Sequence, residues 1–204
     1  SFIKVRTDNV INGRNFKDPL VKNFIFHAFS FGNLENRTID MAYYSLFGIE
    51  KTNKDKLSDI CNLYLTDKNY EHNYVKKVYS DLFFPLHNSL NSFIEIGVEN
   101  GYSVEMWRDY FINAKVIGID INIENAKNHF NKVKPDRIEL LQLNQSNVND
   151  LEYIINKYSN IDVILDDGSH KMYDQQITFS KLFRILKPNG IYIIEDLHTS
   201  LEVH

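Results

Sequence analysis

The stretch Ile161-Asp-Val-Ile-Leu-Asp-Asp-Gly-Ser-His170 decides the fold of this chain. Its first half is mostly apolar and β-branched, which is typical of a strand buried on both faces of a parallel sheet. Its second half brings two carboxylates, a glycine, a hydroxyl and an imidazole to the loop that follows. Open α/β sheets bind ligands at the carboxyl ends of their strands, so this stretch predicts both a core element and a functional site.

A second stretch, Gly190-Ile-Tyr-Ile-Ile-Glu-Asp196, repeats this design with an apolar strand that ends in two carboxylates. If the two strands are neighbours, five side chains converge on one patch: Asp166, Asp167, His170, Glu195 and Asp196. Carboxylates so close together repel one another unless a cation lies between them. Carboxylate oxygens suit Mg²⁺ or Mn²⁺, whereas zinc favours clusters of thiols or histidines. The sequence therefore predicts a divalent-cation site.

Between residues 92 and 194, apolar strand patterns alternate with helical segments. We expect strands at 92–96, 115–119, 137–141, 161–165 and 190–194, and helices at 103–111, 124–132, 149–158 and 174–186. This alternation predicts an α/β fold, a doubly wound, Rossmann-like parallel sheet. Right-handed crossovers then place the carboxyl ends of all the strands at one edge.

The residues before the sheet read as a helical N-terminal extension. Helices are expected at 20–31, 38–47, 54–65 and 74–84, with a polar loop at 66–74. Many aromatic residues in the first of these favour a helix buried on several sides, in contact with another subunit. A substrate pocket is the alternative interpretation of the same residues.

The composition excludes several classes of protein. The 204 residues are 43% hydrophobic and 25% charged, as in globular proteins. A net charge of −4 without a long basic run argues against a nucleic-acid partner. No apolar run approaches the length of a membrane span. A single cysteine, Cys61, allows no internal disulfide, which is typical of a cytoplasmic protein.

A glycine loop follows the first expected strand, in Glu95-Ile-Gly97-Val-Glu-Asn-Gly101-Tyr-Ser103. Its spacing is G-x-x-x-G and not the G-x-G-x-x-G of dinucleotide enzymes. Glycines let the backbone approach a ligand, and Ser103 is expected to cap the next helix. Glu95 would repel a pyrophosphate but attract an ammonium group.

Asp120 ends the second strand, where a carboxylate can bind both hydroxyls of a ribose. An ammonium group and a ribose without a phosphate describe S-adenosylmethionine. The alternative for each motif taken alone is structural: a pair of loop glycines and a capping aspartate.

Residues 66 to 200 resemble class I S-adenosylmethionine-dependent O-methyltransferases. More narrowly, they resemble the metal-dependent sugar methyltransferases of the macrolide (mycinamicin and tylosin) type and their relatives in surface-glycan clusters. The resemblance rests on these motifs: Thr66-Asp-Lys68 with Tyr74, Glu95-Ile-Gly-Val98, Met106-Trp-Arg-Asp-Tyr-Phe111, Gly118-Ile-Asp120, Asp166-Asp-Gly-Ser-His170, and Glu195-Asp196 with Thr199-Ser200. It implies that Asp167, Glu195 and Asp196 hold Mg²⁺ and that His170 is the general base.

Two departures from the family pattern concern the cofactor and the end of the sheet. The family often has Gly-Asp-Gln-Ser-Asp near the adenine, where this chain has Leu143-Asn-Gln-Ser-Asn147. Gln145 and Ser146 match, and Asn144 replaces the aspartate. Beyond Ser200 the family continues with more sheet, whereas this sequence has only four further residues, so the last two strands are expected to be missing.

The sequence thus predicts an S-adenosylmethionine- and Mg²⁺-dependent (or Mn²⁺-dependent) O-methyltransferase. Its acceptor is expected to be a sugar hydroxyl of a nucleotide-activated sugar or of a surface polysaccharide intermediate. A cation lowers the pKa of a hydroxyl that it coordinates, and a nearby imidazole can take the proton. Two alternatives stay open: an NAD-dependent oxidoreductase and a non-catalytic, methyltransferase-like partner subunit.

The predicted site and domains follow from this interpretation. Asp167 and His170 are the expected catalytic residues. Residues 1–80 are expected to supply a lid, the acceptor site or the contacts of a homo-oligomer, and residues 81–204 the catalytic domain. The expected cofactor-binding residues are Glu95, Gly97, Gly101, Ser103, Asp120, Gln145, Ser146 and Asp166.

Overall fold

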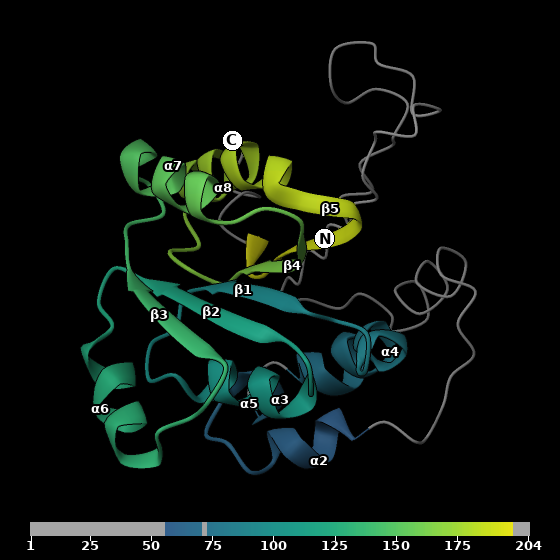
Figure 1. The fold of residues 1–204 in the computed structure, drawn as a ribbon. Coiled ribbons are helices and arrows are strands. Elements are labelled where there is room, and N and C mark those ends of the chain that lie inside the picture. The colour runs from purple at the N-terminus through teal and green to yellow at the C-terminus, as the bar shows by residue number, and fades with distance from the viewer. Residues whose placement is uncertain (1–55, 71–72, 198–204) are drawn as a thin grey trace, which may run out of the picture.

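A five-stranded parallel sheet forms the centre of the molecule (Figure 1). The computed structural model describes residues 56–70 and 73–197. The strand order is β3-β2-β1-β4-β5, so the chain winds outward from β1 in one direction and then in the other. The bounds are β1 Ser92–Ile96, β2 Lys115–Asp120, β3 Ile138–Gln142, β4 Ile161–Asp166 and β5 Leu186–Ile194. This order confirms the expected doubly wound fold.

Helices cover both faces of the sheet, α7 and α8 on one side and α2, α5 and α6 on the other (Figure 1). Side chains of successive strand residues point to opposite faces, so Phe93 packs in one core cluster and Ile94 in the other. The bounds are α2 Leu57–Cys61, α3 Asp67–Tyr70, α4 Ser80–Phe83, α5 Tyr102–Tyr110, α6 Glu124–Val133, α7 Val148–Lys157 and α8 Met172–Leu182. Single-turn 3₁₀ helices span Phe84–Leu86 and Phe183–Ile185.

The strand register brings the loops that follow β1, β4 and β5 together at the carboxyl edge of the sheet. Ile96 pairs with Asp166, and Asp166 pairs in turn with Ile194. The backbone N–H of Asp167 then donates to the oxygen of Ile96, and that of Glu195 to the oxygen of Asp166, at 2.8 and 2.9 Å. The first residues after β1, β4 and β5 are therefore neighbours at the carboxyl edge of the sheet.

The segment before β1 differs from expectation. The helix expected at 54–65 is described only as the short α2, and the expected loop at 66–74 contains α3. Where one helix was expected at 74–84, the chain forms a π-helix, Val75–Tyr79, then α4 and a 3₁₀ turn that contains Pro85. A π-helix bonds residue i to i+5, so it brings residues five apart toward one face. The helices expected at 20–31 and 38–47, and also Thr199 and Ser200, lie outside the described residues.

An aromatic cluster joins this segment to the sheet. Trp107 stacks on Phe93 at 5.2 Å between ring centroids, and Phe83 meets Phe111 edge-on at 5.2 Å. Tyr79 stacks on Phe83 at 5.4 Å. All five rings are buried, and each such pair contributes about 0.5–1.5 kcal/mol beyond its buried area. The π-helix and α4 therefore pack as part of the same core as β1 and α5.

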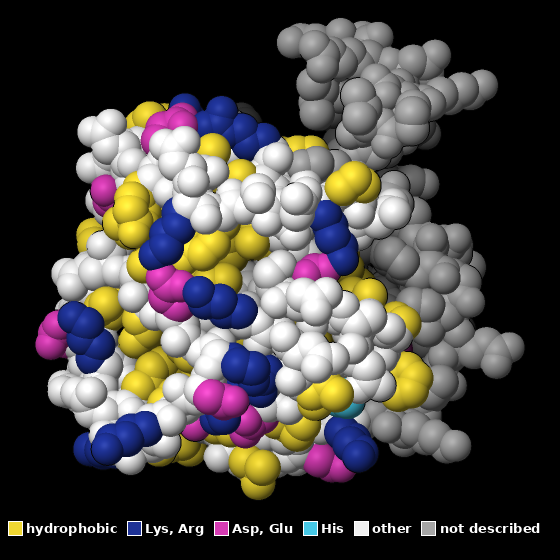
Figure 2. All heavy atoms as spheres, in the orientation of Figure 1, with side chains coloured by type: hydrophobic (Ala, Val, Ile, Leu, Met, Phe, Trp, Pro, Cys, Tyr) yellow, Lys and Arg dark blue, Asp and Glu magenta, His cyan; other side chains and the backbone are white. Residues whose placement is uncertain are grey.

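The surface mixes charges of both signs. On the face shown in Figure 2, basic and acidic side chains lie next to one another, with hydrophobic ones between them. Glu152 pairs with Lys181 and Arg184 at 2.8 and 2.7 Å, and such exposed pairs contribute little to stability. Among the described helices, none is long and apolar enough to cross a membrane.

Candidate active site

The glycine loop after β1 is shaped by close contacts that only glycine permits. Gly97 has φ +91°, and a Cβ built on it would lie 2.0 Å from the backbone oxygen of Asp167. The loops after β1 and β4 therefore cross at van der Waals distance, which any side chain at this position would prevent. Gly101, at φ +86°, precedes α5 and donates its N–H to the oxygen of Val98 at 2.8 Å.

The expected helix cap at Ser103 is wrong, because α5 begins at Tyr102 and its N-cap residue is Gly101. The Ser103 hydroxyl instead donates to Oε2 of Glu95 at 3.0 Å. Ser103 still lines the neighbouring cavity. It thus belongs to the site by its contact with Glu95 and not by capping the helix.

Asp120 holds the glycine loop in place. Its Oδ2 accepts hydrogen bonds from the backbone N–H groups of Val98 and Glu99, at 2.7 and 3.1 Å. Its Oδ1 accepts from the backbone of Asn122 at 3.0 Å. Asp120 also lines the cavity, so the carboxylate at the end of β2 is fixed in orientation and accessible to a ligand.

Two cavities adjoin at this edge of the sheet, with volumes of about 420 and 350 Å³. Gly97, Asp120 and Gly168 line both of them. The first also contains Ser103, Asp167 and His170 in its wall, and the second Gln145 and Ser146. The two together lie where β1, β2, β3 and β4 end, as expected for an open α/β sheet.

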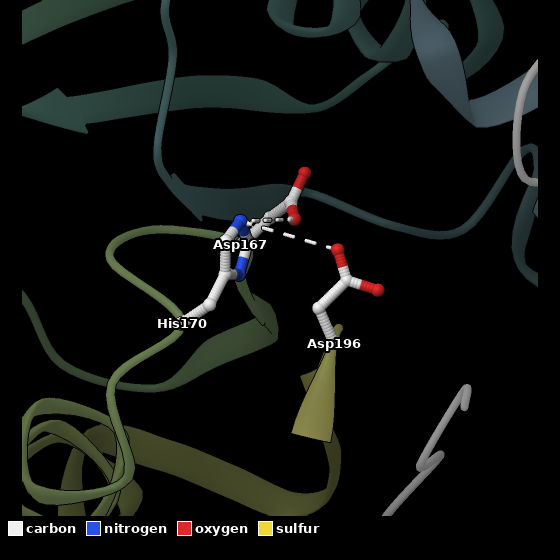
Figure 3. Close-up of side chains that lie close together, drawn as sticks. All are labelled: Asp167, His170 and Asp196. Atoms are coloured by element: carbon white, nitrogen blue, oxygen red, sulfur yellow. Dashed lines mark ion pairs between the residues drawn. The ribbon is translucent and has the colours of Figure 1, made fainter. Parts of the chain in front are cut away.

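Three potential metal ligands lie close together: Asp167 and His170, which line the larger cavity, and Asp196, which is buried beside them (Figure 3). One ligand atom from each lies within 4.8 Å of the others. Nε2 of His170 is 4.0 Å from Oδ1 of Asp167 and 3.9 Å from Oδ2 of Asp196. Two carboxylates beside an imidazole offer oxygen ligands that fit a hard divalent cation such as Mg²⁺.

Two features constrain the metal-ligand candidates: the backbone conformation of His170 and a hydrogen bond from a tyrosine to Asp196. His170 has φ +57°, a left-handed conformation that is uncommon outside glycine and is often found at functional sites. The hydroxyl of Tyr74 donates to Oδ1 of Asp196 at 2.7 Å. That bond leaves Oδ2, the oxygen that is turned toward His170, for other contacts.

A buried lysine in the wall of the larger cavity contacts one of the metal-ligand candidates. Lys68 of α3 is 1% exposed, and its Nζ is 3.1 Å from each carboxylate oxygen of Glu195 and 3.6 Å from Oε1 of Glu95. It also donates to Oδ2 of Asp167. Burial alone would lower the pKa of Lys68, but the three carboxylates outweigh it and hold the pKa well above its usual value.

Three predicted site residues lie behind the cavities. Glu95, Asp166 and Glu195 are at most 1% exposed and are not among the described residues that line either cavity. Burial raises the pKa of Glu95, which Lys68 opposes only in part, and that of Asp166, to about 7 in both cases. Glu195 accepts from Lys68 and from the hydroxyl of Tyr79, whereas the sequence predicted it as a metal ligand beside Asp196.

Gln145 braces the loop that follows β4. Its Nε2 donates to Oδ1 of Asp166 at 3.1 Å, and its Oε1 accepts from the backbone of Ser169 at 2.7 Å. Next to it, Oδ1 of Asn144 accepts from the backbone and the hydroxyl of Ser146, at 2.9 and 2.7 Å. The amide at position 144 therefore supports the turn that carries Ser146.

The sequence interpretation gave no role to Lys68, Tyr74 or Tyr79. All three lie in the segment where a polar loop, 66–74, and an ordinary helix, 74–84, were expected. A usable signal was present, because Thr66-Asp-Lys68 and Tyr74 were among the motifs of the family resemblance. Each of these side chains contacts Asp167, Glu195 or Asp196.

Comparison with known proteins decides the family. A family model described as a methyltransferase domain matches residues 88–203. The chain belongs to this family. In this methyltransferase domain, the matched region begins just before β1 and contains the glycine loop, Asp120 and the three metal-ligand candidates.

Curated relatives of this methyltransferase domain act on glycosylated antibiotics. The chain is 30% identical over 154 residues to mycinamicin VI 2''-O-methyltransferase of Micromonospora griseorubida. It is 34% identical over 102 residues to 8-demethyl-8-(2-methoxy-alpha-L-rhamnosyl)-tetracenomycin-C 3'-O-methyltransferase of Streptomyces olivaceus. The matches cover 72% and 50% of this chain, but only 37% and 25% of those enzymes.

A solved structure shows the same fold. The MycE methyltransferase of the mycinamycin biosynthetic pathway, in complex with Mg, SAH and mycinamycin VI, matches with a TM-score of 0.64 and 29% identity. The match covers 74% of this chain and 41% of that one. The chain thus spans less than half the length of each of these three relatives.

Proposed function

We propose that this chain is the catalytic part of an S-adenosylmethionine-dependent, divalent-cation-dependent O-methyltransferase that acts on a sugar hydroxyl. One observation carries the proposal. The larger cavity is bordered by the glycine loop and Asp120 on one side, and by Asp167 and His170 on the other. A methyl donor and a hydroxyl acceptor can therefore meet between a cofactor loop and a proton acceptor. The glycoside methyltransferases among its relatives support the same function.

The charge of the cavity favours a cationic cofactor. Its wall contains one lysine, Lys68, and four acidic residues: Asp67, Glu99, Asp120 and Asp167. They would attract the sulfonium and ammonium groups of S-adenosylmethionine and repel the pyrophosphate of NAD. This argues against the NAD-dependent oxidoreductase. We propose that Asp120 binds the ribose and that Gln145 and Ser146 flank the adenine.

The remaining residues predicted to bind the cofactor have two kinds of proposed role. Gly97 and Gly101 are proposed to admit the cofactor by keeping the loop close to the sheet, and Ser103 to contact it from the wall. Glu95 and Asp166, as direct cofactor contacts, stay predictions, because their carboxylates already have partners within the protein. We propose that they fix the loops that touch the cofactor.

Asp167 and Asp196 are the residues proposed to hold Mg²⁺ or Mn²⁺, in front of His170. A bound divalent ion would lower the pKa of an acceptor hydroxyl at this place and orient it. Glu195 as a third ligand stays a prediction, because both of its oxygens face Lys68 in this structure. A donor set with two carboxylates fits the ion that the MycE structure contains.

His170 is proposed to take the proton of the acceptor hydroxyl on Nε2, the ring nitrogen that is turned toward Asp167 and Asp196. The acceptor oxygen then forms a bond to the methyl carbon while the carbon–sulfur bond breaks. The products are a methyl ether and neutral S-adenosylhomocysteine, and the proton leaves through the imidazole. The loss of the cofactor's positive charge makes its release from the acidic cavity easier.

The acceptor class is the finer part of the proposal. The relatives named above act on sugars of antibiotic glycosides, and we propose a sugar hydroxyl carried by a nucleotide-activated sugar or by a surface polysaccharide intermediate. Residues 1–80 are proposed to supply a lid, acceptor contacts or the interface of a cytoplasmic homo-oligomer. A methyl-transfer assay with nucleotide sugars, glycan fragments and macrolide glycosides in parallel separates these acceptors. A partner subunit without catalysis would methylate none of them.

Replacing Asp120 with alanine should weaken the binding of S-adenosylhomocysteine by about 1.5–3 kcal/mol, the usual value of hydrogen bonds to a charged group. The variant loses both the proposed ribose contact and the bonds that hold the glycine loop. Isothermal titration calorimetry measures the change. Asp136→Ala, which removes an exposed carboxylate paired with Arg108, is the matched control. Unchanged affinity in Asp120→Ala would contradict the assignment of the cofactor site.

A further inference from the structure

One amide side chain ties the loop after β3 to the catalytic loop, residues 167–170, after β4. Gln145 follows β3, and its Nε2 donates to Oδ1 of Asp166 at 3.1 Å. Its Oε1 accepts from the backbone N–H of Ser169 at 2.7 Å. Asp167 lies between these two partners, and His170 directly follows the second. A single side chain therefore holds the segment that carries the proposed base and a metal-ligand candidate.

The same amide explains why position 168 is a glycine. A Cβ built on Gly168 would lie 1.9 Å from Oε1 and 2.8 Å from Cδ of Gln145. The three nearest atoms all belong to this one side chain. The φ of Gly168 is not positive, so the nearby amide, and not an unusual backbone conformation, excludes a side chain here. The catalytic loop is thus folded directly against Gln145.

The first turns of α8 support both partners of this contact. The buried hydroxyl of Thr178 lies 3.3 Å from Nε2 and 3.2 Å from the backbone oxygen of Gln145. The hydroxyl of Ser169 donates to Oδ2 of Asp174, also on α8, at 2.7 Å. Gln145, Gly168 and Ser169 all line the smaller cavity. The hydrogen bond between the two loops therefore lies at the wall of a ligand-sized space.

We propose that Gln145 is a positioning residue that couples occupancy of the smaller cavity by the adenine to the placement of His170. This inference rests on the proposed function, in which the adenine lies beside Gln145. A ligand in the cavity excludes water from the bond between Gln145 and Ser169, and a hydrogen bond is stronger where the local dielectric is lower. Binding of the cofactor thus fixes the loop that carries the proposed base.

The experiment follows the imidazole protons of His170 in the full chain by nuclear magnetic resonance, with the His170→Asn variant to identify their signals. The probe is adenosine, which has the adenine and the ribose of the cofactor but not its methionine part. Adenosine at saturation should shift the His170 signals of the wild type. Gln145→Met keeps the approximate size of the side chain but not its hydrogen bonds, so this variant should lose most of the shift. A shift that adenosine causes by direct contact would remain.

A control and a second variant complete the test. Gln142→Met is the matched control, because Gln142 is an exposed amide at the end of β3, and it should keep the wild-type shift. Gly168→Ala covers the case that Gln145→Met folds poorly. Its added methyl group displaces the amide from the catalytic loop while Gln145 itself is kept, so the shift should be lost here too. Calorimetry establishes for each protein the adenosine concentration that saturates it.

The outcomes separate this inference from the proposed function. A shift in the wild type and in Gln142→Met that is lost in the folded variants of Gln145 and Gly168 supports the coupling. A shift of wild-type size in either folded variant, or no shift in the adenosine-bound wild type, overturns the inference and leaves the proposed function intact. The same holds if S-adenosylhomocysteine binds but adenosine does not. If the wild type binds neither compound, both proposals fail.

Discussion

Replacing His170 with asparagine is expected to lower kcat by about 10²–10⁴-fold, the usual contribution of a general base. His170 lines the larger cavity, and its Nε2 is 4.0 Å from Oδ1 of Asp167 and 3.9 Å from Oδ2 of Asp196. Asparagine keeps polarity and tolerates the left-handed backbone conformation at this position, but it cannot accept the proton at neutral pH. The loss should therefore be in the chemical step and not in the fold.

Two further measurements make this expectation specific. The affinity for S-adenosylhomocysteine should stay within about twofold, because the proposed cofactor contacts lie on the glycine loop and Asp120. His87→Asn is the matched control, since His87 packs against Tyr110 away from the cavities. If His170→Asn retained the wild-type kcat, water or a carboxylate would remove the proton, and the imidazole would only shape the loop.

Removal of divalent ions is expected to lower turnover by about 10³-fold or more, since metal-ion catalysis contributes several kcal/mol. Without an ion, Asp167 and Asp196 present two negative charges to an acceptor oxygen that is itself becoming negative. EDTA should therefore stop methyl transfer, and added Mg²⁺ or Mn²⁺ should restore it. The rate of S-adenosylhomocysteine formation measures both steps.

Asp167→Asn should have the same effect as EDTA, because a neutral amide is a weaker ligand than a carboxylate. Excess Mg²⁺ should not rescue this variant fully. Asp59→Asn, which changes an exposed residue of α2, is the matched control and should behave like the wild type. Full activity of the wild type in excess EDTA would leave a base-catalysed transfer without metal.

The central sheet could be predicted from the sequence because its strands are marked by local patterns. The apolar run that ends at Asp166 has no helical period, and each strand is followed by a turn or by polar residues. All five strands were found, with their ends within a few residues. The same logic placed Asp167, His170 and Asp196 at one edge, since parallel strands end together.

The contacts of Lys68 and Tyr79 with the carboxylates of the site could not be predicted in this way. A sequence shows that Lys68 is charged, but not that it is buried against Asp167 and Glu195. Such pairing depends on how α3 packs, and α3 itself was missed in a polar stretch. The π-helix was likewise missed, because it differs from an α-helix by one residue per hydrogen bond and not by any clear change in composition. The contacts that Glu195 makes with Lys68 and Tyr79 likewise leave no mark in the sequence, and its role as a metal ligand stays a prediction.

The pairing of Lys68 also bears on the order in which the chain acquires its structure. Its partners Asp167 and Glu195 lie 99 and 127 residues further along, so a growing chain buries this ammonium favourably only after β4 and β5 have been synthesised. Contacts that close such long loops form late, because their entropic cost comes before their gain. We expect pulse-labelled hydrogen exchange during refolding to find α3 and the π-helix protected after β1 and β2. The catalytic edge would then be the last part of the molecule to become native.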